Sequence, residues 1–289
     1  MSSFWFPAHI SGFFEPCLHE DPLRSGSRNC GPCLDVGVTT AVKLKKSKKV
    51  LVKLNGRRVR APTTLRVVCE IAPGVGLEVA HRCEVPVGAG LGASGAGALG
   101  AAFATTEILG LPLPQEQLIR IAHRAEVLCR TGLGDVPAQA LGGLVFSLEP
   151  GAPPYGKWMN IEVPGSIRVV VCVLGELKTS RLLRDEEFLH KCKTAGRKAF
   201  RLMSADPNFR TFLRASKDFA ESLGLYDREL KTIAQDLENA GAFGASQAML
   251  GRAVFAFVDV KRLGSVKKVA SDLVGEDLIV ARISKNKPS

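Results

Sequence analysis

Residues 86–97, PVGAGLGASGAG, are the stretch of this chain that decides its fold. Residues 77–85 before it alternate in the manner of a strand, and residues 94–109 after it place apolar side chains at helical spacing. Glycine lets the backbone approach a phosphate closely, and the free N–H groups at a helix N-terminus favour an anion. The stretch therefore predicts a phosphate-binding turn that joins a strand to a helix.

Two common nucleotide-binding motifs do not fit this stretch. A Walker A loop requires Gly-Lys-Ser/Thr, which is absent from residues 86–97. A Rossmann fingerprint requires a correctly spaced third glycine after Gly88 and Gly90, and an acidic residue about twenty positions on before a second parallel strand, and neither is present. The structural alternative is a tightly packed helix of small residues.

Two carboxylates follow the glycine stretch. Glu126 lies in a second expected helix, which runs from about residue 114 to the glycines at 132 and 134. Asp135 comes just before a short expected helix at 136–141. Taken alone, Glu126 reads as a surface residue paired with Arg130 one turn later, and Asp135 reads as the N-cap of its helix.

The glycine stretch resembles the phosphate-binding loop of the GHMP kinases (galacto-, homoserine, mevalonate and phosphomevalonate kinases), whose pattern is PxxxGLGSSA. Ala93 and Gly95 replace the first Ser and the Ala, whereas Ser94 keeps the second Ser. The resemblance implies Mg²⁺ held by Ser94 and Glu126, with Asp135 as the catalytic base for the substrate hydroxyl. It implies that ATP is bound by Pro86, Gly88, Gly90, Leu91, Gly92, Ala93 and Ser94.

Two further segments can be compared with the family pattern: one stands in a corresponding place, and the other departs from it. Residues 241–251, GAFGASQAMLG, stand where GHMP kinases have a small-residue turn that folds back on the nucleotide loop. At the N-terminus, residues 7–9 read Pro-Ala-His where the family commonly has Pro-Gly-Lys, and that Lys assists the base in some members. His9 is a candidate replacement for the Lys, and a hydrogen-bonded structural histidine is the alternative.

Segments at residues 6–14, 21–28 and 34–39 resemble an archaeal branch of the family, which phosphorylates pantoate on the route to coenzyme A. The resemblance implies ATP-dependent transfer to the primary hydroxyl of pantoate. The alternatives are other GHMP acceptors: homoserine, shikimate or mevalonate. Because the pantoate carboxylate needs cations or hydrogen-bond donors, the candidate substrate-binding residues are His9, Ser25, Ser27, Arg28 and Thr179.

The charge of the chain is unevenly distributed. The 289 residues carry a net charge of +11, and nine basic residues with no acidic one lie between Lys43 and Arg60. Asn55 and Gly56 within this segment predict a hairpin. A solvated hairpin is one interpretation; a nucleic-acid-binding or regulatory protein that uses residues 43–60 on a GHMP scaffold is the other. Because no aromatic residues are interleaved with the basic ones, we expect no nucleic-acid partner.

The N-terminal sequence and the cysteines bear on where in the cell the protein is located. Neither a signal peptide nor an apolar run of about 18 residues is evident, so we expect a cytoplasmic protein with reduced thiols and no membrane partner. Four residues have spacing that suits zinc, and unligated thiols are the alternative. They are Cys17, His19, Cys30 and Cys33.

Strands and helices mix along the chain, which predicts an α+β fold of two lobes, residues 1–160 and 161–289. The resemblance implies a ribosomal-protein-like α/β N-terminal lobe that binds the nucleotide, a ferredoxin-like C-terminal lobe and a homodimer. A long loop is expected at 15–32. Strands are expected at 4–6, 36–42, 65–68, 77–85, 144–148, 167–174, 253–259 and 277–283. Further helices are expected at about 182–203, 209–223, 227–239 and 261–273.

Overall fold

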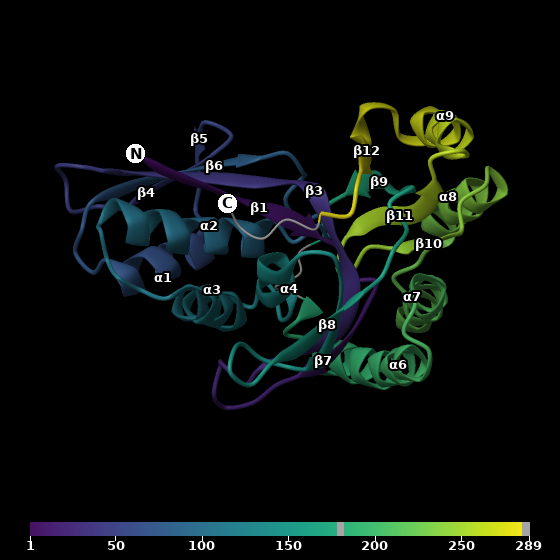
Figure 1. Cartoon of the computed structure of the whole chain (residues 1–289), viewed down its shortest axis with the longest axis horizontal. Coiled ribbons are helices and arrows are strands. Elements are labelled where there is room, and N and C mark those ends of the chain that lie inside the picture. Colours follow the sequence, from purple (N-terminus) through teal and green to yellow (C-terminus); the bar gives the residue numbers. More distant parts are fainter. Residues whose placement is uncertain (178–181, 285–289) are drawn as a thin grey trace.

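The computed structural model of this chain describes residues 1–177 and 182–284. An eight-stranded sheet belongs to the first part of the chain (Figure 1). Its strands are β1 (Ser2–His9), β2 (Phe13–Cys17), β3 (Gly26–Leu44), β4 (Leu51–Leu54), β5 (Arg57–Arg58), β6 (Leu77–Cys83), β7 (Leu144–Glu149) and β8 (Lys157–Ile161). The helices of this part are α1 (Pro62–Ile71), α2 (Ala93–Ile108), α3 (Gln115–Cys129) and α4 (Asp135–Leu141).

Strand β3 organises this sheet because it is 19 residues long. Its first part pairs with β2 and β7, and its second part pairs with β1 and β6. Helix α2 packs on β1 and β3, and α1 and α3 pack on α2. Small residues fill α2, where eleven of its buried positions are Ala, Gly or Thr, so the helix lies close to the sheet.

A four-stranded sheet belongs to the second part of the chain, in the order β10-β11-β9-β12 with antiparallel neighbours. Its strands are β9 (Ile167–Gly175), β10 (Gly244–Gln247), β11 (Arg252–Asp259) and β12 (Leu278–Ala281). The helices are α6 (Glu186–Ala205), α7 (Phe209–Leu223), α8 (Arg228–Asn239) and α9 (Leu263–Val274). The predicted two-lobed α+β fold is confirmed (Figure 1).

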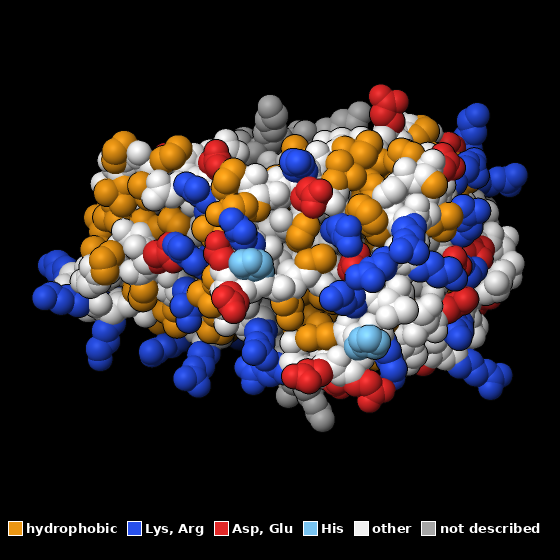
Figure 2. Space-filling model, turned by 90° about the horizontal axis from the view of Figure 1, so that it is seen from below, with side chains coloured by type: hydrophobic (Ala, Val, Ile, Leu, Met, Phe, Trp, Pro, Cys, Tyr) orange, Lys and Arg blue, Asp and Glu red, His pale blue; other side chains and the backbone are white. Residues whose placement is uncertain are grey.

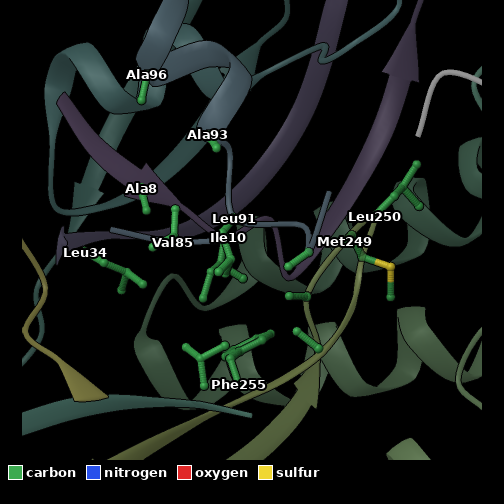
Figure 3. Packing of buried hydrophobic residues seen from close by; sticks show 14 of the residues in the cluster. Ala8, Ile10, Leu34, Val85, Leu91, Ala93, Ala96, Met249, Leu250 and Phe255 are labelled. Atoms are coloured by element: carbon green, nitrogen blue, oxygen red, sulfur yellow. The ribbon is translucent and has the colours of Figure 1, made fainter. Parts of the chain in front are cut away.

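The two sheets share one hydrophobic core. Ile10 after β1, Leu91 in the glycine turn and Phe255 of β11 belong to the same buried cluster (Figure 3). The backbone N–H of Met249 donates to the carbonyl of Ser11 at 2.9 Å, which ties the C-terminal small-residue turn to the N-terminal strands. The glycine turn therefore lies where the two parts of the chain meet.

Two of the expected elements are wrong. Residues 65–68 belong to helix α1, not to a strand; Pro62 occupies its first turn, and Thr63, Thr64, Val67 and Val68 form its buried face at helical spacing. The expected loop at 15–32 is mostly β2 and β3, and only residues 18–25 connect them. Its polar residues pair across the two strands: Glu15 lies opposite Arg28.

Two strands were missed. β8 carries KWMNI, which has little alternation, and β10 carries the small residues GASQ within the segment expected to be a turn. The basic segment does form the predicted hairpin, with positive φ at Asn55 and Gly56, between β4 and β5. No helix among the described residues is both long and apolar enough to cross a bilayer.

Candidate active site

A pocket of about 230 Å³ opens where the glycine turn faces the loop before α4. The turn contributes residues 87, 88 and 90–94, the loop contributes residues 131–135, and Met249 and Leu250 close one side. Ser11, Phe14, Ser27 and Leu183 complete the lining. Three separate segments that carry the predicted motifs thus share one cavity.

The glycine turn leads from β6 into α2 in a conformation that needs glycine. Gly88, Gly90 and Gly92 have φ of +87°, +81° and +64°. A Cβ on Gly90 would lie 2.9 Å from the carbonyl oxygen of Ala248, so the C-terminal small-residue turn packs directly on this glycine. No side chain caps the N-terminus of α2, which leaves its first N–H groups available for an anion.

Ser94 and Glu126 meet beside this turn. The hydroxyl of Ser94 donates to Glu126 Oε1 at 2.6 Å, and Thr131 donates to the same oxygen at 2.6 Å. Burial raises the pKa of Glu126 to about 7, and the hydrogen bonds from Ser94 and Thr131 only partly oppose this shift. Its other oxygen, Oε2, is buried without a hydrogen-bond partner among the described residues.

This arrangement of oxygens suits Mg²⁺. A buried carboxylate oxygen that lacks a donor is costly unless a proton or a cation satisfies it. A Cβ on Gly132 would lie 2.3 Å from Glu126 Oε2 and 3.1 Å from Asp135 Oδ2, so both carboxylates face this glycine. Hard oxygen donors of this kind, completed by phosphate oxygens and water, are the preferred ligands of Mg²⁺.

Asp135 is held by His9. Their atoms Oδ1 and Nδ1 are 2.7 Å apart; the His9 side chain is fully buried, and that of Asp135 is 21% exposed. The carboxylate accepts, so His9 Nδ1 carries the proton. Gln139, one turn after Asp135, donates to the carbonyl oxygens of Pro7 (2.9 Å) and Gly92 (2.8 Å). These bonds tie α4, the end of β1 and the glycine turn together.

Known proteins resemble this chain in sequence and in structure. Residues 58–143 match the model of the GHMP kinases N terminal domain. A pantoate kinase of Thermococcus kodakarensis is 32% identical over 279 residues, which cover 93% of this chain and 91% of that protein. A pantoate kinase of Methanocaldococcus jannaschii is 31% identical and covers 86% of this chain and 90% of its own.

The chain belongs to the GHMP kinases, in the group of the pantoate kinases. A solved structure described as a phosphotransferase related to the CoA biosynthesis pathway has a TM-score of 0.89 and 30% identity, and covers 99% of this chain and 97% of its own. A homoserine kinase from Cytophaga hutchinsonii, at 16% identity and a TM-score of 0.74, shares the fold, covering 100% of this chain and 96% of its own. Like other GHMP kinases, the chain is an ATP-dependent phosphotransferase that acts on a hydroxyl group.

The predicted substrate-binding residues of this kinase lie at different distances from the pocket. Ser27 lines it. Ser25 does not line it; its side chain is buried, and its hydroxyl donates to the carbonyl of His19 at 2.7 Å. The guanidinium of Arg28 is 2.6 Å from Glu15 Oε2 and lies over the ring of Phe200. Thr179 lies outside the described residues.

Several residues of the kinase pocket were missed in the sequence. Thr131 and Gln139 each follow a predicted residue at helical or near-helical spacing, after Glu126 and Asp135, and that spacing was the available signal. Ser11 and Phe14 lie in the segment 6–14 that carries the family resemblance, but nothing in that segment singles them out. The zinc alternative finds no support, because no group of three or more His, Cys, Asp or Glu in the described ranges could hold a metal ion. Cys33, for example, donates to the carbonyl of Ala138.

Proposed function

We propose that this GHMP kinase transfers the γ-phosphoryl group of ATP to the primary hydroxyl of pantoate, a step of coenzyme A biosynthesis. The observation that carries the reaction type is the meeting of the glycine turn and Asp135 in one pocket, where the lining residues Ser94 and Thr131 both donate to the buried Glu126 carboxylate. The acceptor is supported by relatives named pantoate kinase, which are 30–32% identical over most of their length.

The nucleotide phosphates are bound by the glycine turn in this proposal. The predicted residues are Pro86, Gly88, Gly90, Leu91, Gly92, Ala93 and Ser94; all but Pro86 have a backbone N–H to offer, and the N-terminus of α2 favours the β- and γ-phosphates. Ser94 and Glu126 hold Mg²⁺, which neutralises phosphate charge when it is bound. Thr131 keeps the Glu126 carboxylate oriented through its 2.6 Å hydrogen bond.

Asp135 is the proposed base for the acceptor hydroxyl. It accepts the hydroxyl proton as the oxygen attacks the γ-phosphorus, and ADP departs with the bridging oxygen. His9 fixes Oδ1 through the 2.7 Å contact, so Oδ2 remains for the proton. His9 thereby takes the positioning role that Lys has in some GHMP kinases.

The acceptor binds beside Asp135 in this proposal. Ser11 and Ser27 both line the pocket, and the side-chain amide of Asn29 donates to the Ser11 hydroxyl at 3.1 Å. Ser25, Arg28 and Thr179 stay candidates for the pantoate carboxylate; Arg28 then shares its charge between the carboxylate and Glu15.

One assay tests the acceptor and the cofactor together. ADP release from ATP is measured with pantoate, homoserine, shikimate and mevalonate, each with Mg²⁺ and with EDTA. We expect release with pantoate that depends on Mg²⁺, and at most traces with the other three acceptors. Faster release with another acceptor would assign that substrate instead, and release that survives EDTA would remove Mg²⁺ from the mechanism.

Assembly, location and domain division are proposals as well. We propose a homodimer, as the GHMP resemblance implies, to be measured by light scattering, and a cytoplasmic location, where ATP and reduced thiols occur together. The eight cysteines are all free, which accords with that location. We propose lobes at residues 1–160 and 161–289; the chain changes sheets between residues 161 and 167.

A further inference from the structure

A second concentration of positive charge lies outside the kinase pocket, on helices α6 and α7. Residues 191–217 include eight basic residues and one acidic residue, Asp206. Helix α6 lies at the lower edge of the molecule in Figure 1 and faces the reader in Figure 2, where Lys and Arg side chains gather over it. This region is far along the chain from the basic hairpin at 43–60.

The surface under this charge is hollowed. Two hollows, of about 530 Å³ and 420 Å³, share Lys198 and Arg201 of α6. Arg214 of α7 lines the larger hollow, and Arg197 lines the smaller one. We call the two hollows together the α6–α7 groove. Apolar atoms also line it, from Ala195, Ala199, Leu202 and Phe219.

The cations of the groove are largely uncompensated. Arg197 reaches Glu15 Oε1 at 3.2 Å. Lys198, Arg201 and Arg214 are exposed and make no ion pair with any described residue. Asp218 is the single carboxylate among the described residues that line the groove. Like charges held this close repel one another, so an anion between them would relieve that repulsion.

Packing does not account for these side chains. The buried face of α6 consists of Phe188, Cys192, Gly196, Ala199 and Met203. Arg197, Lys198 and Arg201 are exposed instead. Arg201 lies three residues after Lys198 and four after Arg197, so the three side chains share the face of α6 that is not buried. A helix whose charged side chains are merely solvated requires no hollow beside them, whereas a binding site for a ligand does.

We propose that the α6–α7 groove binds a small phosphate ester, a dianion with a compact apolar portion. Guanidinium groups match phosphate oxygens in pairs, and two arginines with a lysine supply enough charge for a dianion. The apolar floor favours an ester over inorganic phosphate, and the volumes are those of small-molecule sites. Single-stranded nucleic acid fits less well, because none of the described residues that line the groove is an exposed aromatic side chain for base stacking.

The test uses the full chain with its kinase pocket filled by a non-hydrolysable ATP analogue, Mg²⁺ and pantoate. 1-Naphthyl phosphate is titrated into this complex by calorimetry, and 1-naphthol is the uncharged control. The groove variant is Arg201→Ala/Arg214→Ala, and the matched control is Lys191→Ala/Lys193→Ala, which removes the same charge from α6 outside the groove. Arg197 is kept, because its bond to Glu15 supports β2.

We expect one equivalent of 1-naphthyl phosphate to bind, with Kd raised at least ~10-fold in the groove variant and less than ~2-fold in the control. Equal weakening in both variants would mean general attraction by net charge, and an unchanged groove variant would mean another location; either result overturns the proposal. Binding of 1-naphthol with the same Kd would also overturn it, because the site would then be merely apolar. Oligouridylate that binds more tightly than 1-naphthyl phosphate, with the same dependence on Arg201 and Arg214, would identify a nucleic-acid surface instead.

Discussion

Glu126 shows how one buried carboxylate can couple folding, protons and metal. Burial raises its pKa to about 7, so near neutral pH the carboxyl either keeps its proton or carries a charge that no described residue compensates at Oε2. A cation on Oε2 replaces the proton. Mg²⁺ binding should therefore release a proton near pH 6.5 and tighten as the pH rises through about 7.

The same shift predicts a pH-dependent cost in stability. Below the ordinary pKa of 4.5 the carboxyl is protonated in both the folded and the unfolded chain. Between pH 4.5 and about 7 the Glu126 carboxyl ionises only in the unfolded chain, so the folded state loses stability as the pH rises, by roughly 3 kcal/mol in total. In EDTA, Glu126→Gln should exceed wild type in free energy of unfolding by an amount that grows from pH 5 to pH 8.

Urea titrations at both pH values measure this difference. Added Mg²⁺ should stabilise wild type at pH 8 and leave Glu126→Gln unchanged, which is the control for a metal-specific effect. A difference between the two proteins that is the same at pH 5 and pH 8 would contradict the raised pKa.

Asp135 and His9 give a second prediction at this scale. Asp135→Ala should lower kcat by at least ~10²-fold with folding intact, because the hydroxyl loses its base. His9→Ala should lower kcat by roughly 10-fold, and His9→Asn should recover most of it, since the Asn amide can donate from the position of Nδ1. Steady-state ADP release measures all three. Equal losses in His9→Ala and His9→Asn would exclude the positioning role.

The sequence revealed Ser94, Glu126 and Asp135 because a family pattern orders them along the chain. It did not reveal their neighbours. Thr131 reaches Glu126 only because the loop after α3 turns back, and Gln139 bridges two carbonyl oxygens from distant segments. The Gln139 contacts are tertiary, and the pairing of Arg28 with Glu15 is likewise hidden until β2 and β3 are known to pair.

At the scale of the element, the glycine turn is fixed by both conformation and space. Gly90 has φ of +81° and a Cβ there would meet Ala248 and Gly251 at 2.9 Å. Gly74 has φ of +75° with nothing within 4 Å of a Cβ. Gly90→Ala should therefore raise the KM for ATP by ~10-fold or more and lower Tm, whereas Gly74→Ala should cost only about 1 kcal/mol of backbone strain.

Kinetics at varied ATP and thermal melts of the two glycine variants check this. The comparison separates the strain of positive φ, which both share, from the collision, which only Gly90→Ala has. Equal effects would mean that the contact with residues 248–251 does not shape the nucleotide site.

Elements with a clear period were predicted well, and the errors have physical causes. Val67 and Val68 favour a strand by propensity, but the packing of α1 against α2 selects the helix that Pro62 starts. The polar residues of 15–32 favour a loop when the sequence is considered alone. A buried strand tolerates Glu15 and Asn29 only when partners satisfy them, as Arg28 and Ser11 do here. Pairing of that kind is invisible in one sequence.

At the scale of the whole molecule, the two lobes hold each other. A Cβ on Gly12 would lie 2.2 Å from the hydroxyl oxygen of Ser216 on α7, so the N-terminal strands fit tightly into the C-terminal lobe. Beyond β12 the chain returns to the larger sheet: the N–H of Ser284 donates to the carbonyl of Cys33 at 2.8 Å. Because buried hydrophobic residues of both lobes also form one continuous cluster, neither lobe has a complete hydrophobic core of its own.

We therefore expect the chain to unfold in one cooperative step. Both tryptophans, Trp5 and Trp158, lie in strands of the larger sheet, so their fluorescence follows only the N-terminal lobe. Far-UV circular dichroism also follows helices α6–α9 of the other lobe. In urea the two signals should share one midpoint, because exposing the junction at Gly12 costs both lobes their packing. Separate midpoints would mean that the lobes are independent domains. In that case Gly12→Val, which forces Ser216 and Phe212 aside, should lower only one of the two midpoints.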